Sequence, residues 1–128
     1  MKFGYTILYV SDVVATLEFY ETAFGFQRKL LHETDYAELE TGATRLAFAR
    51  DAFARVLVGM PLETPTVSGL PAPMEIGLIT EDVEAAYARA IAAGATELEA
   101  PASKPWGQVV AYVRDLNGFI IELGSPLS

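Results

Sequence analysis

The chain has 128 residues, of which 52% are hydrophobic, enough for one domain with a core of its own. Its 17 acidic residues outnumber its 9 lysines and arginines, giving a formal net charge of −8. This balance argues against nucleic acid and anionic membranes as partners, because phosphate contacts require clustered cations. The sequence has no cysteine, which excludes disulfide bonds, thiolate metal sites and cysteine nucleophiles. With no signal-peptide pattern and no membrane-spanning apolar run, we expect a cytoplasmic protein.

The first half of the chain predicts a strand, a helix and three further strands. Residues 3–10 are β-branched and aromatic, which favours a strand, and Ser11 or Asp12 then supplies the N-cap of a helix over about 12–24. Gly25 is expected to end this helix. The apolar side of the helix, predicted to face the core, consists of Val13, Val14, Leu17, Phe19, Tyr20 and Phe24. The three strands are predicted at residues 27–33, 36–40 and 44–50.

The second half repeats this pattern after an irregular segment. Within that segment residues 53–58 fit either a short helix or an edge strand, and the proline-rich stretch after them is predicted to be a linker. The elements expected next are a strand at 74–80, a helix at about 82–93, a strand at 96–98, a loop at 100–107, and strands at 109–114 and 119–123. Asn117-Gly118 favours a tight hairpin between the last two strands.

The stretch from residue 5 to residue 26 has an echo at residues 75–96. Without gaps, Leu8 aligns with Leu78 and Asp12 aligns with Asp82, and each copy is an apolar strand, an acidic cap and a helix ended by glycine. We therefore predict a single α+β domain of two βαβββ modules, at about 1–50 and 74–128, joined by a linker at about 51–73. The cleft between such modules is the natural place for a site.

Three stretches resemble one known family over nearly the whole chain. LYVSDVVATLEFYETAFGF fits the first strand and helix, DVEAAYARAIAAGA with KPWGQ fits the second helix and a later loop, and RDLNGFIIELGSP fits the closing hairpin. Together they resemble the vicinal oxygen chelate superfamily, which holds glyoxalase I, extradiol dioxygenases, and fosfomycin- and bleomycin-resistance proteins. The resemblance implies two βαβββ modules that form an incompletely closed, barrel-like sheet around a ligand cleft.

The enzymes of this superfamily bind a divalent metal through their first, fourth, fifth and eighth strands. Matching the motifs puts those four positions at Tyr5, Ala47, Glu75 and Glu122, where the pattern has histidine at the first and third and glutamate at the second and fourth. Alanine has no donor atom, and a tyrosine phenol titrates near 10. A zinc, nickel or iron site normally needs three protein ligands. The sequence therefore predicts neither a metal nor another cofactor, with Glu75 and Glu122 as weak metal candidates.

Alternation along the strands extends the predicted site around these positions. It is expected to be apolar and aromatic with two carboxylates, and the loop that carries the single tryptophan is expected to reach over it. The predicted ligand-binding residues are Tyr5, Ile7, Arg45, Ala47, Phe48, Glu75, Trp106, Tyr112 and Glu122. Structural roles compete with these, since Tyr5 or Trp106 could belong to the core and the two glutamates could be solvated or paired with Arg45. His32 is interpreted as a surface residue.

These observations predict a protein that binds a small molecule and has no catalytic residue. It resembles the metal-free, bleomycin-resistance side of the superfamily, whose members sequester a drug, and it would hold an aromatic ligand, either cationic or neutral. One alternative is a glyoxalase-like lyase or extradiol-dioxygenase-like enzyme with an atypical divalent metal site, using Glu75 and Glu122. Another is a structural or regulatory subunit without a small ligand. The resemblance also implies a homodimer, and no nucleic acid or membrane partner is expected.

Overall fold

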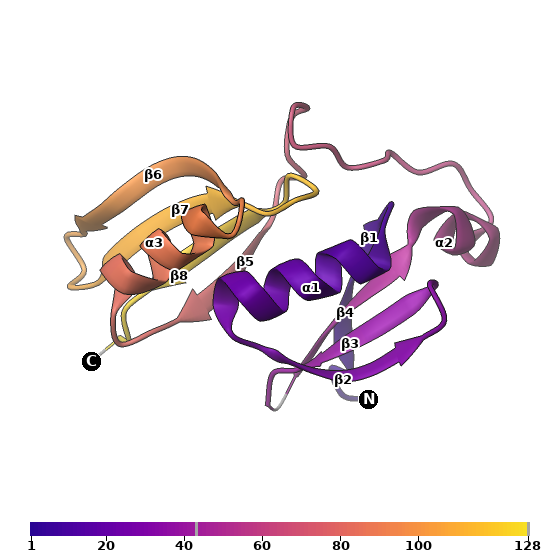
Figure 1. The fold of residues 1–128 in the computed structure, drawn as a ribbon, viewed down its shortest axis with the longest axis horizontal. Helices are drawn as coiled ribbons and strands as arrows, with labels where there is room; N and C mark the ends of the chain where they lie inside the picture. The colour runs from indigo at the N-terminus through magenta and orange to yellow at the C-terminus, as the bar shows by residue number, and fades with distance from the viewer. Residues whose placement is uncertain (43, 128) are drawn as a thin grey trace. The chain divides into compact units, whose positions relative to one another are not determined.

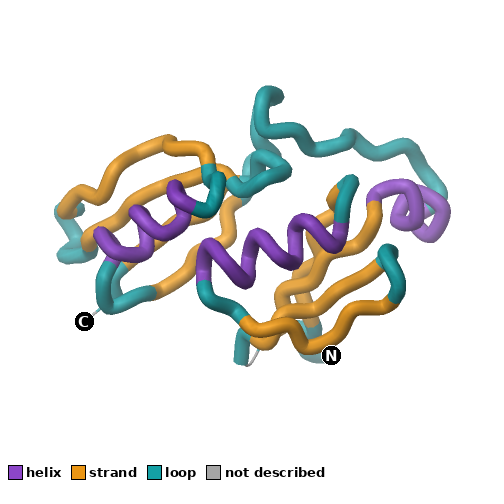
Figure 2. Tube along the Cα trace, viewed as in Figure 1, coloured by secondary structure: helices purple, strands orange, loops and turns teal. Residues whose placement is uncertain are grey.

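The computed structural model describes residues 1–42 and 44–127, which form two compact units that meet in sequence between Pro65 and Thr66. Each unit holds one mixed four-stranded sheet with a helix against it, as Figures 1 and 2 show. The predicted second module ends at Ser128, which lies outside the described residues. Within those residues, no helix is both long enough and apolar enough to cross a membrane.

The first unit, ending at Pro65, contains a complete βαβββ module followed by one more helix. Its elements are β1 (Tyr5–Val10), α1 (Val13–Phe24), β2 (Gln27–His32), β3 (Tyr36–Glu40), β4 (Arg45–Arg50) and α2 (Asp51–Val58). The strand order is β1-β4-β3-β2, with β1 parallel to β4 and the other pairs antiparallel. Residues 53–58, whose sequence fits either a short helix or an edge strand, therefore form part of helix α2.

Helix α1 begins and ends where its sequence predicts. Asp12 Oδ1 accepts a hydrogen bond from the Ala15 amide at 3.0 Å, and Gly25 ends the helix with a φ of 76°. On the side that faces the sheet, Tyr20 is completely buried, and its ring centroid lies 4.8 Å from that of Phe48 in β4. This face of the sheet is therefore the core of the first unit.

The second unit, beginning at Thr66, repeats the module. Its elements are β5 (Glu75–Ile79), α3 (Val83–Ala92), β6 (Thr96–Ser103), β7 (Val109–Arg114) and β8 (Ile120–Gly124). The strand order β5-β8-β7-β6 matches that of the first unit, and Asp82 Oδ1 accepts from the Ala85 amide at 3.0 Å as Asp12 does in α1. The predicted α+β fold of two modules is confirmed, as two open sheets that are not closed into a barrel.

Strand β6 differs from its prediction, which ended it at residue 98 and placed a loop at 100–107. The strand continues to Ser103, and its pairing with β7 shifts register between Glu97 and Glu99 and again between Glu99 and Ala102. These irregularities break the two-residue alternation on which a strand prediction depends. Pro101 is tolerated because β6 lies at the edge of the sheet, where an unpaired position needs no amide donor.

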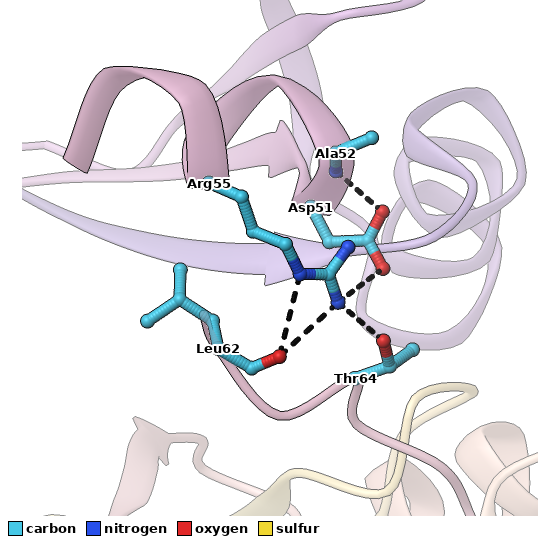
Figure 3. Close-up of polar contacts among 5 residues, drawn as sticks. All are labelled: Asp51, Ala52, Arg55, Leu62 and Thr64. Atoms are coloured by element: carbon cyan, nitrogen blue, oxygen red, sulfur yellow. Dashed lines mark hydrogen bonds and ion pairs between the residues drawn. The ribbon is translucent and has the colours of Figure 1, made fainter. Parts of the chain in front are cut away.

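Arg55 of α2 binds the part of the linker that precedes Pro65, called here the first arm, and so attaches it to the first unit (Figure 3). Its Nε and Nη2 atoms each donate to the Leu62 carbonyl at 3.3 Å, and Nη2 also donates to Thr64 Oγ1. Asp51 Oδ2 lies 3.6 Å from the guanidinium one helical turn away and helps to orient it.

Arg114 of β7 binds the part of the linker that begins at Thr66, called here the second arm, in the same manner. It is buried, and its Nη2 atom donates to the carbonyls of Thr66 at 3.2 Å and Gly69 at 2.9 Å. A Cβ atom at Gly118 would lie only 2.3 Å from the Thr66 carbonyl oxygen, so only glycine fits at this position of the closing hairpin. Each arm of the linker is therefore bound to its own unit.

Candidate functional site

The face of the first sheet that lies opposite α1 carries most of the site residues predicted for this unit. Strand pairing places Tyr5 opposite Arg45, and Ile7 and Glu38 on either side of Ala47. Paired residues point to the same side of a sheet, so these five side chains share one face. Tyr5 and Arg45 are exposed, Ile7 is half-buried and Ala47 is fully buried.

This arrangement contradicts the prediction that Phe48 is a ligand-binding residue. It follows Ala47 in β4 and therefore points to the other side of the sheet, where it is completely buried against Tyr20. Phe48 belongs to the core of the first unit and not to the face that carries Tyr5 and Arg45.

A polar cluster that the sequence analysis missed lies on this face and is centred on Glu38. Glu38 as a residue is only 6% exposed, its carboxylate accepts a hydrogen bond from the Tyr36 hydroxyl at 2.7 Å, and its Oε1 lies 3.8 Å from Arg45 Nε. The pKa of Tyr36 is raised well above its ordinary value. Burial of the phenol is the largest cause, followed by its hydrogen bond to Glu38 and by the negative charge of Glu38. Tyr36 therefore stays a neutral donor that fixes Glu38. The only sequence signal for it is a glutamate in the middle of a predicted strand.

The face of the second sheet opposite α3 carries the two predicted glutamates. Pairing places Gly77 and Tyr112 on either side of Glu122, with Glu75 two residues before Gly77 on the same face. The Tyr112 hydroxyl donates to Glu122 Oε1 at 3.2 Å. A Cβ atom at Gly77 would lie 3.5 Å from Glu122 Oε2, so the glycine leaves the carboxylate open on the β5 side.

The negative charge of Glu122 affects the titration of Glu75. Partial loss of water around Glu75, followed by the negative charge of Glu122, raises the pKa of Glu75. The pKa of Tyr112 is also raised, by burial first and then by Glu122 and Glu75, so its phenol remains a neutral donor. Among the ion pairs found in the described residues, none includes either glutamate. This face therefore presents two acidic groups without a basic partner.

Trp106 lies on the loop between β6 and β7, and hydrogen bonds fix its orientation. Its indole Nε1 donates to Gln108 Oε1 at 2.7 Å, and Gln108 Nε2 donates to the Ser125 carbonyl at 2.8 Å. A Cβ atom added at Gly124 would lie 3.2 Å from Gln108 Nε2 and 3.8 Å from Glu122 Oε2, so the Gln108 and Glu122 side chains both lie beside Gly124. The loop is thus tied to the glutamate-bearing face while the indole remains 60% exposed.

Equivalent positions in the two modules carry different chemistry. Strand register makes Tyr5 equivalent to Glu75, Ala47 equivalent to Glu122, and Glu38 equivalent to Tyr112. At these equivalent positions the first unit therefore presents one carboxylate, with the guanidinium of Arg45 beside it. At the same positions the second unit presents two carboxylates, and Arg114, which the register also places on this face, donates to the carbonyls of Thr66, Gly69 and Gly118 instead.

The donor set does not fit the divalent metal of the superfamily's enzymes. No group of three or more histidine, cysteine, aspartate or glutamate side chains within residues 1–42 and 44–127 could hold a metal ion. Glu38 does not replace the carboxylate missing at Ala47, because its oxygens are already engaged by Tyr36 and face Arg45. His32 is exposed in the edge strand β2.

Known proteins share this architecture. A family model described as the glyoxalase/bleomycin resistance protein/dioxygenase superfamily matches residues 2–123. A family enzyme from Burkholderia phytofirmans PsJN is 26% identical, with a TM-score of 0.81, and the match covers 94% of this chain and 95% of that one. No curated protein matches the sequence significantly.

Two further solved structures support the fold alone. A glyoxalase-related enzyme from Fulvimarina pelagi is 20% identical, with a TM-score of 0.86 and coverage of 98% of this chain and 88% of that one. A lactoylglutathione lyase from Agrobacterium tumefaciens is 21% identical, with a TM-score of 0.72 and coverage of 97% and 92%. On the strength of the family model and the repeated modules, the chain belongs to the glyoxalase/bleomycin resistance protein/dioxygenase superfamily.

Proposed function

We propose that the protein binds and sequesters an aromatic cation without using a metal. The observation that carries the proposal is the acidic pair Glu75 and Glu122, which lies beside the Tyr112 hydroxyl and has no basic partner among the described ion pairs. A cationic group placed between the two carboxylates would relieve their mutual repulsion. The same arrangement would discriminate against an anionic ligand.

The magnitudes favour a ligand that joins a charged group to an aromatic ring. A hydrogen bond to a charged group contributes about 1.5–3 kcal/mol, and an amidinium could make one to each carboxylate. Contact with the exposed face of Trp106 would add roughly 0.5–2 kcal/mol. The hydrogen bond from Trp106 to Gln108 supports this role, because an indole that is already oriented loses less entropy on binding.

The chemistry of the second unit supports binding over catalysis. In the Tyr112–Glu122 hydrogen bond the phenol remains a neutral donor, because the pKa of Tyr112 is raised. A glyoxalase-like or dioxygenase-like reaction would need a metal that the donor set does not fit. The enzyme alternative therefore receives no support from the geometry.

The test compares two naphthalene probes of the same shape, the cation 2-naphthamidine and its neutral isostere 2-naphthamide, in which a carbonyl oxygen replaces one nitrogen. We expect calorimetry to show at least tenfold tighter binding of the amidine, corresponding to about 1.4 kcal/mol, and loss of this difference in Glu75→Gln and Glu122→Gln. Glu84→Gln, which removes an exposed carboxylate from the first turn of α3, is the matched control and should bind like the parent. Equal affinity for both probes, or equal effects in all three variants, would overturn the proposal.

A further inference from the structure

We propose that the first unit recognises an aromatic carboxylate through Arg45 and Tyr5. This inference goes beyond the proposed function, because it concerns a different unit and a ligand group of opposite charge. The two residues face each other across the parallel β1–β4 pair on the side opposite α1, and both are exposed. Adjacent strands lie about 4.8 Å apart, so a ligand that reaches the guanidinium also reaches the phenol ring.

The guanidinium of Arg45 differs from the other three in the first unit. Arg28 makes two short hydrogen bonds to Glu21, at 3.0 and 2.9 Å, and Arg50 donates to Asp35 at 2.8 Å. Arg55 is occupied by the linker. Among the described residues the one ion-pair contact of Arg45 is a 3.8 Å approach to Glu38, too long for a hydrogen bond, so its donors remain available to a ligand.

Glu38 orients this arginine without occupying it. The glutamate is buried and fixed by Tyr36, so it cannot swing outward to close on the guanidinium. It faces the Nε side of Arg45, which leaves the two terminal nitrogens for a second carboxylate. A planar guanidinium held on one edge is suited to bidentate recognition of a carboxylate on its other edge.

Tyr5 gives the site its preference for an aromatic ligand. Its side chain is exposed, yet its position is fixed in β1 opposite Arg45. The phenol ring offers a flat apolar surface, and aromatic pairs contribute roughly 0.5–1.5 kcal/mol beyond the area that they bury. Because the protein is strongly acidic overall, binding of an anion here depends on this one arginine.

The experiment uses 2-naphthoate, with 2-naphthamide as the neutral isostere, and follows both calorimetry and the arginine Nε–H signals by NMR. We expect 2-naphthoate to shift the Arg45 signal and to bind at least tenfold more weakly to Arg45→Gln. Arg28→Gln, an arginine of the same sheet that pairs with α1, is the control and should bind like the parent. Tyr5→Leu should weaken 2-naphthoate several-fold while keeping the charge preference.

Three results would overturn the inference. These are no binding of 2-naphthoate up to about 10 mM, no preference for it over 2-naphthamide, or equal affinities in Arg45→Gln and Arg28→Gln. Glu122→Gln separates this inference from the proposed function, because it should abolish the amidine preference while 2-naphthoate binding still depends on Arg45. Each of the two ideas can therefore fail while the other stands.

Discussion

Replacing Tyr36 by phenylalanine tests the polar cluster of the first unit most directly. The change removes one hydroxyl and leaves Glu38, which is 6% exposed, without the donor that lies 2.7 Å from its Oε2 atom. Losing the partner of a buried polar group costs about 1–3 kcal/mol, and the upper part of this range applies when the orphaned group is charged. We therefore expect Tyr36→Phe to lower the free energy of unfolding by about 2–3 kcal/mol.

The second unit supplies a matched comparison for this prediction. Tyr112→Phe removes a longer hydrogen bond, of 3.2 Å, from Glu122, which is half-buried and can be solvated instead. Its expected loss is about 0.5–1.5 kcal/mol. Urea denaturation followed by circular dichroism measures both variants, with Tyr5→Phe as the exposed control. A Tyr36→Phe variant as stable as the control would refute the conclusion that Tyr36 satisfies a buried carboxylate.

Three further predictions concern binding, the linker and assembly. The raised pKa of Glu75 means that this carboxylate takes up its proton at a higher pH than an ordinary glutamate, so 2-naphthamidine affinity should begin to fall, as the pH is lowered from 7, before an ordinary glutamate titrates; calorimetry showing the same pH dependence in Glu75→Gln would contradict this. Arg55→Ala should speed thermolysin cleavage between residues 59 and 64, because the linker loses its contacts at Leu62 and Thr64, whereas Arg28→Ala should not. Family membership leads us to expect a homodimer, and sedimentation velocity showing only monomer at micromolar concentration would count against it.

Local signals in the sequence were sufficient to predict the fold. Asp12 and Asp82 cap their helices through the same side-chain oxygen, as their positions before two apolar, periodic stretches indicated. Such signals need no knowledge of distant residues. Strand β6 was predicted too short because its pairing with β7 shifts register twice, so no regular alternation marks residues 99–103 as a strand.

The candidate site was predicted only in part, for a related reason. Tyr5 and Glu75 were predicted because the family that the sequence resembles places a metal ligand at a fixed spacing before each helix cap. Glu38 was missed because its importance comes from its pairing with Ala47, and register between strands is not visible in one strand's sequence. Phe48 could have been excluded, since neighbours in a strand point to opposite faces and Ala47 was already placed on the site.

The two linker arginines have a consequence for how this chain could be taken apart. Arg55 binds carbonyl and hydroxyl groups before Pro65, and Arg114 binds carbonyls from Thr66 onward. A peptide bond cut between Pro65 and Thr66 would leave every one of these acceptors on the same fragment as its arginine. If the two halves were expressed separately, each would keep the arginine that binds its own linker segment. This junction is therefore the natural place to split or circularly permute the protein.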